Sequence, residues 1–589
     1  MRSFVGIIVI NLIVPACLLG QPSQTDARFD LRDYYGDGTT DYTTAVRDQS
    51  WGTCWIFGTT AAMESNLTVT GNWAAADMVG EADLAEYHLD KFSGFTRKGM
   101  DGDEIPSNSW FTGQGPPFPG SNTDEPLATR THGLIVHLGG DYRIATAYLV
   151  NHGAVNETLN TEIIEGDYPA KRVKFGYSDT DGIPKCDDSY VYFIPRHIEW
   201  HTLSGTDAEK RQRIKQAVIS YGSVGTCMYW GGGFYSEGTH YQPVDDENLP
   251  NHAVAIVGWD DDKATQAEFN GAWLCRNSWG DSWGEYGDGH FWISYYDKHT
   301  ARHPEMGGVT FRDVDKVSFD AIYSHSLHGW QYDTSGDPAI AAAANRFVAE
   351  QSERLKSVGF YTIAEDVSYT VRIHRDDLSS AAVTQISGTM ARPGFHKVEL
   401  DDVVVLDTGQ VFFIAMEVDK GGHAFDASFV VETAMGPISE APQDVYYTEE
   451  TWDNSYKFDT SSVSRAMGTI TGPPYDVYSA AGVNESFYKD ASGQWWDFVA
   501  YDGHGRLGTE WDDSSWNFAI TGYAARLKHG DINKDGSVDS ADFAILGVQW
   551  GHSTDNLSAD IAPEPGGDGI VNERDLQVLA ECWLTEIGE

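Results

Sequence analysis

The segment from Asp48 to Ser65, DQSWGTCWIFGTTAAMES, constrains the fold of this chain more than any other. Small and apolar residues recur in it at the spacing of one helix face, namely Phe57, Gly58, Ala61, Ala62 and Ser65. The pattern predicts a closely packed helix that begins at Cys54. Unpaired N–H groups and the positive end of the dipole at a helix N-terminus favour the nucleophilic thiolate. Cys54 is therefore a candidate nucleophile, and a buried structural cysteine is the alternative.

Two later segments supply the partners that such a thiolate needs. His252 begins the apolar run 253–257, which is typical of a buried strand, and Asn277 follows a second strand-like run. A cysteine nucleophile, a histidine base and an amide side chain that orients the base together form the cysteine version of a catalytic triad. Gln49, just ahead of Cys54, can donate an amide N–H to a developing oxyanion together with the Cys54 backbone N–H.

Taken in this order, the motifs resemble those of the papain-like cysteine peptidases over roughly Phe29 to Phe311. The resemblance implies a catalytic set of Cys54, His252 and Asn277, with Gln49 at the oxyanion. It also implies that an extended peptide binds at a glycine pair, and that indole rings shelter the asparagine. These substrate-binding candidates are Gly139, Gly140, Trp279 and Trp283.

The chain departs from the family pattern in two places. The stretch from Gln49 to Cys54 is one residue shorter than the family usually has, and Trp51 lies near the position of a family disulfide cysteine. His252 follows Cys54 by about 200 residues rather than the usual 130–150. This spacing implies insertions around 96–131 and 161–200, which we expect to reshape the cleft.

The first 22 residues read as a secretion signal, with Arg2 followed by an apolar run too short for a comfortable membrane span. Val14-Pro15-Ala16 fits a small-residue cleavage pattern, and Cys17 leaves a lipoprotein anchor as the less favoured alternative. Little chain separates this leader from the mature-like start at 28–32, so no inhibitory propeptide is expected. We therefore expect a bacterial protein that is secreted or associated with the cell surface.

Composition excludes several partners. The 589 residues carry a net charge of −48, which argues against binding to nucleic acid or to an anionic membrane surface. After the leader, no segment is long and apolar enough to cross a bilayer. The six cysteines form no disulfide framework, and Cys227 and Cys275 are expected to be core thiols rather than a bridge.

The peptidase-like region, residues 27–312, reads as helices first and strands later. This order is typical of a two-lobed α+β fold with Cys54 on one wall of a cleft and His252 and Asn277 on the other. The predicted helices are 57–69, 83–92, 141–150 and 208–220. The predicted strands are 224–230, 253–259, 272–276 and 290–295.

Residues 314–525 change character and read as a second, β-sandwich domain. Short β-branched or aromatic runs such as LKSVGFYTI and VFFIAMEVD alternate with Gly, Pro and Asp turns. The region resembles the lectin-like domain of some bacterial papain-like peptidases, which implies a glycan or cell-surface ligand. Four tryptophans are candidates for stacking on sugar rings, although core packing is the favoured interpretation of each: Trp495, Trp496, Trp511 and Trp516.

The tail, residues 529–589, carries a duplicated calcium-loop pattern. Hard oxygen donors at alternate positions around a glycine are typical of an EF-hand-like loop. The first set is Asp531, Asn533, Asp535, Ser537, Asp539 and Asp542. An offset of 33 residues repeats Asp535, Asp539 and Asp542 as Asp568, Asn572 and Asp575, and Asp560 completes the second set.

This tail resembles a dockerin, the module that binds a cohesin on a scaffold or cell surface. The resemblance implies a small all-α domain whose core depends on structural Ca²⁺. Asp560 and Asp568 are separated by about four residues more than the consensus spacing. A calcium-stapled tail with a purely structural role is the alternative.

Together these features predict a multidomain, secreted cysteine endopeptidase that uses no catalytic cofactor and is tethered by its tail. It would hydrolyse peptide bonds through a thioester acyl-enzyme. Two alternatives remain open at this point. One is a catalytically weak, tethered adhesion or binding protein, and the other is an acyl or amide transferase that uses the same triad.

Overall fold

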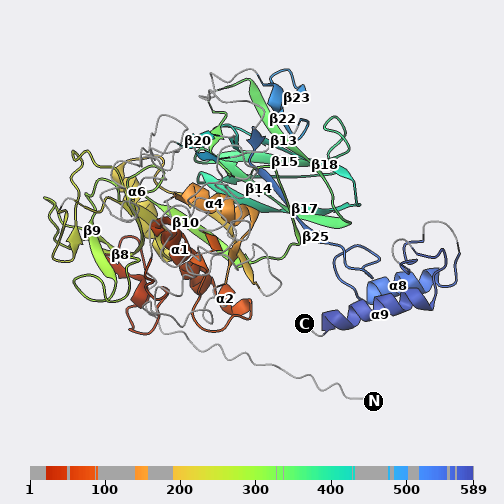
Figure 1. Cartoon of the computed structure of the whole chain (residues 1–589), viewed down its shortest axis with the longest axis horizontal. Helices are drawn as coiled ribbons and strands as arrows, with labels where there is room; N and C mark the ends of the chain where they lie inside the picture. The colour runs from red at the N-terminus through yellow and green to blue at the C-terminus, as the bar shows by residue number, and fades with distance from the viewer. Residues whose placement is uncertain are drawn as a thin grey trace, which may run out of the picture.

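The computed structural model describes residues 22–49, 53–86, 88–89, 140–156, 190–231, 233–326, 328–335, 337–426, 429–431, 475–477, 483–501, 516–553, 557–563 and 567–587 (Figure 1). The expected leader, the 96–131 insertion, Gly139 and Trp511 lie outside the described residues. Within the described ranges, no helix combines the length and the apolar character that a membrane crossing requires.

Helix α1 (Cys54–Thr70) begins at the predicted residue and is the central helix of the peptidase half. Side chains from Trp55 to Leu67 are buried on all sides of the helix, which explains its run of small and apolar residues. Gly58 permits a close approach, because a Cβ there would lie 2.7 Å from the hydroxyl of Tyr142 on α4 (Tyr142–Asn151). The helix ends at Gly71, which has the left-handed conformation (φ 75°) that glycine adopts readily.

Most of the predicted elements of the peptidase half are confirmed. The two further helices are α4 and α6 (Asp207–Tyr221). The four strands are β4 (Val224–Met228), β7 (His252–Asp260), β8 (Ala272–Arg276) and β9 (His290–Ser294).

The helix predicted over 83–92 is wrong at its start. Leu84 forms an isolated bridge with Asn156 instead, and the helical conformation begins only at Glu86. The Leu84 N–H donates to the buried carboxylate of Glu64, 2.9 Å away, which holds this backbone out of a helix. A tertiary hydrogen bond therefore overrides local propensity here.

A 14-stranded sheet runs through both halves of the chain. At its centre, β3 (Tyr192–Trp200) pairs with β10 (Val309–Lys316) on one side and with β17 (Gly394–Leu406) on the other. The interpretation of 161–200 as an inserted loop is therefore wrong for 192–200, which form a central strand. The expected domain boundary near residue 313 lies inside β10.

The lectin-like region adds a second, six-stranded sheet. Buried side chains of this sheet and of the large sheet form one apolar core, as a β-sandwich requires. The six strands are β16 (Thr384–Met390), β15 (Val367–Arg375), β18 (Val411–Val418), β13 (Ile340–Val348), β22 (Ser486–Asp490) and β23 (Trp495–Asp497). The large sheet contributes β14 (Glu353–Thr362), β17, β25 (Ile520–Arg526) and β11 (Ala321–Ser324).

The remaining elements are short. They are β1 (Arg28–Asp30), η1 (Leu31–Asp33), α2 (Asn72–Ala75), β2 (Ala154–Val155), β5 (Tyr235–Ser236), β6 (Thr239–His240), β12 (Tyr332–Asp333), β19 (Ala424–Asp426), β20 (Phe429–Val431), β21 (Tyr475–Val477), η5 (Phe498–Ala500) and β24 (Asn517–Phe518).

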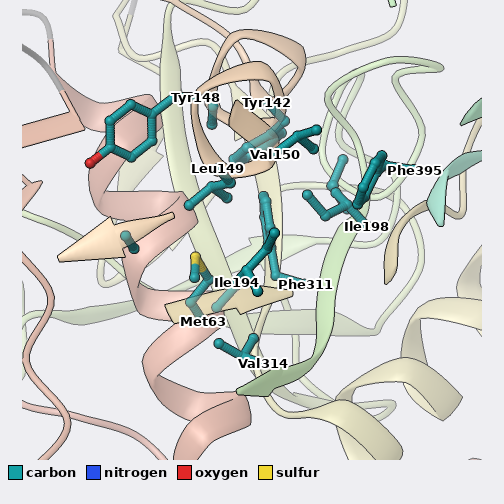
Figure 2. Close-up of a cluster of buried hydrophobic side chains, with 14 of the residues drawn as sticks. Met63, Tyr142, Tyr148, Leu149, Val150, Ile194, Ile198, Phe311, Val314 and Phe395 are labelled. Atoms are coloured by element: carbon teal, nitrogen blue, oxygen red, sulfur yellow. The ribbon is translucent and has the colours of Figure 1, made fainter. Parts of the chain in front are cut away.

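One hydrophobic cluster joins the two halves of the molecule. Figure 2 shows side chains of α4 above side chains from β3 and β10, with Phe395 of β17 beside Ile198 of β3. Trp330 and Tyr523 belong to the same cluster. The peptidase core and the lectin-like region are therefore continuous.

The described part of the tail contains α8 (Ser540–Gln549) and α9 (Glu573–Ile587), which lie at one end of the molecule in Figure 1. Residues of both repeats bury a small apolar core, in which Val538 and Leu546 match Val571 and Leu579. Its buried members are Ile532, Val538, Leu546, Ala559, Val571 and Leu579.

Candidate active site

The candidate nucleophile lies at the first residue of α1, against the first residues of β7. Cys54 is half-buried, and its sulfur has a hydrogen bond with the backbone of Ala253. Burial raises the pKa of the Cys54 thiol to about 11, against this hydrogen bond, which lowers the pKa. The helix N-terminus thus has the predicted position, but the surrounding apolar residues oppose the thiolate.

The candidate base and its orienter are joined directly. The Nε2 atom of His252 lies 2.8 Å from Oδ1 of Asn277, and this oxygen also accepts the Ser278 backbone N–H. Because an amide oxygen only accepts, Nε2 carries the proton, and Nδ1 is the basic nitrogen of the neutral ring. Trp279 stacks on the imidazole at 4.6 Å between centroids and an interplanar angle of 21°. Burial lowers the His252 pKa to about 4.

A single pocket brings the thiol and the imidazole together. Apart from these two groups its lining is mainly apolar. The lining residues are Cys54, Trp55, Gly140, Cys227, Pro250, Asn251, His252, Ala253 and Met306. The two predicted walls of the cleft, one from α1 and one from β7, therefore meet at the candidate catalytic pair.

The oxyanion candidate, Gln49, is tied to the turn that carries Asn277. Its backbone N–H donates to the Ser278 carbonyl at 2.6 Å, and the Ser278 hydroxyl donates to its Oε1 at 2.5 Å. The neighbouring Asp48 forms a bridge with Trp279. Ser278 thus fixes the oxygen end of the Gln49 amide, which leaves the nitrogen end as the donor side. No sequence pattern gave Ser278 a role, although it lies between the two candidates Asn277 and Trp279.

The glycine and tryptophan candidates lie around this pair in different ways. A Cβ at Gly140 would lie 2.5 Å from Cε2 of Trp55, so only glycine allows this approach to α1. Gly139 is outside the described residues. Trp283 meets the Trp279 ring edge to face at 5.0 Å and packs on Phe291, so it supports the indole that covers His252.

A buried ionic network, which no sequence pattern predicted, lies behind the site. Glu64 of α1 is fully buried and accepts the Thr44 hydroxyl at 2.5 Å. The guanidinium groups of Arg47 and Arg276 lie 3.8 and 3.9 Å from its carboxylate. These arginines precede Gln49 and Asn277 in the chain. A glutamate inside an apolar helix was the available signal, because a buried carboxylate needs cationic or hydrogen-bonding partners.

The two loops of the tail share one hydrogen-bond pattern. Asp531 accepts the backbone N–H groups of Asp535 and Gly536, as Asp560 accepts those of Asp568 and Gly569. At the end of each loop, a fully buried Asp542 or Asp575 accepts backbone N–H groups from both sides of its own loop. In its described residues, the longer second loop therefore keeps the hydrogen-bond pattern of the first.

Calcium fits the donor chemistry of these loops, because every predicted ligand offers a hard oxygen. Burial raises the pKa of Asp531, and the nearby Asp542 and Asp535 raise it further. A cation among these carboxylates would relieve that repulsion. The parts of the chain that the structure describes hold no ready-made group of three or more His, Cys, Asp or Glu side chains for a metal ion.

Family comparisons define the class of both large regions. Residues 138–305 match the family described as papain family cysteine protease, and residues 322–460 match the family described as lectin like domain. The chain therefore contains a papain-family cysteine peptidase domain and a lectin-like domain. The first match includes His252 and Asn277, and it begins after Cys54 and Gln49.

Individual relatives match shorter stretches. A cathepsin L-like peptidase of Aedes aegypti is 38% identical over 106 residues, which are 17% of this chain and 30% of that protein. Cathepsin K of Mus musculus is 41% identical over 126 residues, or 19% and 37% of the two chains. The chain thus spans about a third of the length of these curated relatives.

Two solved structures share the fold over most of the chain. The cysteine protease and lectin-like domains of Cwp84, a surface layer associated protein of Clostridium difficile, align with a TM-score of 0.55 at 20% identity, over 86% of this chain and 90% of theirs. Cwp84 after propeptide cleavage gives a TM-score of 0.54 at 21% identity, over 82% and 97%. The order of a peptidase fold followed by a lectin-like fold is therefore shared.

Proposed function

We propose that this chain is an exported cysteine endopeptidase that hydrolyses peptide bonds through a thioester acyl-enzyme. One observation carries the proposal: Cys54, at the start of α1, lines the same pocket as His252, and the His252 ring is joined to Asn277 at 2.8 Å. The papain-family match and the cathepsin relatives support the same chemistry. The reaction needs no metal or organic cofactor.

Proton transfer opens the proposed reaction. His252 Nδ1 takes the proton of the Cys54 thiol, while Nε2 keeps its hydrogen bond to Asn277. Asn277 therefore fixes the tautomer and stabilises the imidazolium that forms. Trp279, stacked on the ring, excludes water from this hydrogen bond.

The thiolate then attacks the peptide carbonyl. The Cys54 backbone N–H and the Gln49 amide nitrogen stabilise the oxyanion, and Ser278 holds the Gln49 side chain in the required orientation. His252 returns the proton to the leaving amine. Water, activated by the same imidazole, hydrolyses the thioester and regenerates the thiol.

The pocket favours an apolar substrate side chain beside the scissile bond. Cys227, Pro250, Ala253 and Met306 are among the apolar residues that line the pocket. Gly140, packed against Trp55, leaves its backbone next to this surface. An extended peptide bound along it is the substrate geometry that we propose.

The flanking regions would localise the enzyme. We propose secretion through residues 1–22, and calcium-dependent tethering of the tail to a cohesin-type scaffold. On the lectin-like region, Trp496 is 45% exposed and its indole N–H donates to Asp490, whereas Trp516 is buried in the core. Trp496 with its neighbour Trp495 is therefore the better candidate for stacking on a glycan.

The test is cleavage of a denatured protein mixture by the chain without its first 22 residues, compared with the Cys54→Ala variant, with cut sites read by mass spectrometry. Cleavage that disappears in the variant supports the peptidase, and transfer to an added amine in place of water would identify a transferase. No cleavage by either chain, with the thiol shown to be reduced, would refute the proposal in favour of a tethered binding protein.

A further inference from the structure

Helix α4 links the substrate pocket to the lectin-like region. It follows Gly140 of the pocket directly, and its C-terminal turn meets residues from beyond β10. The Tyr523 hydroxyl donates to the Val150 carbonyl at 3.1 Å, and the Asn151 side chain donates to the Ser326 carbonyl at 2.9 Å. Figure 2 shows four side chains of α4 in this shared core, namely Tyr142, Tyr148, Leu149 and Val150. The lectin-like region therefore covers α4.

At the other end of α4, Arg143 is buried between the two regions, with 3% of its surface exposed. Its guanidinium carbon lies 3.8 Å from the ring centroid of Trp330, which precedes β12 of the lectin-like region. It also lies 5.9 Å from the ring of Trp200 on β3. Since arginine stays protonated when buried, this stacking and its polar contacts compensate the charge.

The polar contacts of Arg143 lead to both sides of the pocket. On one side, Asp141 follows Gly140 and caps α4 by accepting the N–H groups of Arg143 and Ile144, each at 2.9 Å. On the other side, Arg143 Nη2 lies 3.5 Å from Oε1 of Glu305, the residue before Met306 of the pocket. Arg143 therefore connects the backbone segments that carry two pocket residues.

Trp330 holds this connection from outside the peptidase region. Its ring covers the guanidinium, and its carbonyl accepts from Nη1 of Arg143 at 3.4 Å. Glu305 is held separately, because its carbonyl accepts the indole N–H of Trp200 at 2.8 Å. Without Trp330, the buried guanidinium would lose one face of its enclosure and would shift together with Asp141 and Glu305.

We propose that Trp330, acting through Arg143, is a positioning residue of the substrate pocket, so that the lectin-like region sets the distance between the Gly140 and Met306 walls. The inference rests on the proposed peptidase function. It makes the lectin-like region part of the substrate-binding apparatus rather than only a separate ligand-binding module.

The test compares Trp330→Ala and Trp330→Phe in the full chain, with a fluorogenic peptide that carries an apolar side chain beside the scissile bond. We expect Trp330→Ala to raise KM about tenfold while kcat and the rate of Cys54 alkylation by iodoacetamide change less than about twofold. Trp330→Phe keeps an aromatic face over Arg143 and should restore most of the affinity.

Trp516→Ala is the matched control. Trp516 is as deeply buried, but its ring packs on Phe425 and Phe498 in the sandwich core, a different hydrophobic cluster from the one that contains α4 and Trp330. It should lower the unfolding temperature without changing KM. An equal rise of KM in both alanine variants, or an unchanged KM in Trp330→Ala, would overturn the inference.

A binding measurement separates this inference from the proposed function. Calorimetry with the same peptide on the Cys54→Ala background reads the pocket without catalysis, and Trp330→Ala should weaken that binding about tenfold. If the wild-type chain cleaves nothing but this difference persists, the peptidase proposal fails and the positioning role stands. If cleavage is normal and binding is unaffected by Trp330→Ala, only the positioning role fails.

Discussion

Opposing effects act on the pKa values of the candidate nucleophile, Cys54, and the candidate base, His252. Burial raises the Cys54 pKa to about 11 and lowers that of His252 to about 4, so the apolar surroundings favour the neutral pair. The hydrogen bond with Ala253 and the start of α1 act in the opposite direction on the thiol. The hydrogen bond with Asn277 raises the His252 pKa and so favours the imidazolium. Catalysis therefore depends on a few polar contacts within an apolar pocket.

Gly140→Ala tests the close packing of the Gly140 pocket wall against Trp55. The new Cβ would lie 2.5 Å from Trp55, so the backbone must shift, and we expect about 1–3 kcal/mol of lost unfolding free energy together with a raised KM. Urea unfolding and peptide kinetics measure the two effects. Gly547→Ala is the control, because a Cβ there meets no atom within 4 Å. An unchanged KM in Gly140→Ala would remove Gly140 from the substrate wall.

At the scale of elements, α1 positions the thiol and also holds two other segments, the one before Gln49 and the one before Asn277. Glu64 accepts from Thr44 and Leu84, and its carboxylate faces Arg47 and Arg276. These contacts join the segment before Gln49 to the end of β8, where Asn277 follows. The helix thus sets the relative position of oxyanion donor and orienter.

Glu64→Gln should disturb this arrangement without changing the side-chain size. Removing the negative charge leaves two buried guanidinium groups undercompensated, and we expect a loss of about 3 kcal/mol in the free energy of unfolding. Calorimetry and Cys54 alkylation kinetics would measure stability and site geometry. Glu209→Gln on the exposed capping box of α6 is the control and should change little. Equal stability of the two variants would contradict a structural role for the network.

At the scale of the molecule, one sheet and one hydrophobic cluster cross the expected domain boundary. Strand β3 lies between β10 of the peptidase half and β17 of the lectin-like half. Neither half can bury these strands fully alone. We therefore expect the two halves to unfold together and the tail, with its own core, to unfold separately.

Acid should destabilise this joint unit before most carboxylates are protonated. Burial lowers the pKa of seven imidazoles to about 3 or 4, so they stay neutral in the folded chain while the unfolded chain binds protons below about pH 6.5. The contribution of these imidazoles to the free energy of unfolding is complete above pH 6.5 and is lost as the pH falls towards 4. These residues are His197, His201, His252, His290, His303, His396 and His423.

Urea midpoints measured from pH 7 to pH 5 should therefore fall steadily. Glu86 acts with the opposite sign, because burial raises its pKa to about 8 and its contribution is lost as the pH rises from about 4.5 to 8. Burial also raises the pKa values of other carboxyls, which act in the same direction as Glu86, namely Glu64, Asp141, Glu199 and Glu353. The seven imidazoles outnumber these groups. A midpoint that stays constant between pH 7 and pH 5 would contradict the neutral state of the buried imidazoles.

We expect removal of the proposed calcium to act on the tail alone. Chelation leaves the carboxylates of Asp531, Asp535 and Asp542 to repel one another, and we expect the two tail helices to unfold while peptide cleavage continues. Far-ultraviolet circular dichroism and the cleavage assay follow the two regions, with Asp542→Asn as a second way to weaken the first loop. Loss of cleavage together with the tail would contradict their independence.

Local patterns in the sequence predicted much of the fold and of the site. Side-chain periodicity sufficed for α1, α4 and α6 and for the strands β7 and β8, because each element buries one continuous set of residues. The hydrogen bond between His252 and Asn277 agrees with the predicted base and orienter. Strand β3 was missed because Pro195 and the charged Arg196 interrupt its apolar pattern, and it is defined by its partners on both sides.

The sequence by itself determined the chemical identities: the thiol, imidazole and amide in order along the chain, a β-rich second region, and a duplicated acidic tail. Only the tertiary structure decided how these groups behave. Burial, which no local pattern specifies, raised the Cys54 pKa and lowered the His252 pKa, so that it favours the neutral pair over the ion pair. Contacts between distant segments placed Glu64 behind the site and Trp330 on Arg143. Their energies depend on solvent exclusion by many residues at once, and solvent exclusion is a property of the folded chain.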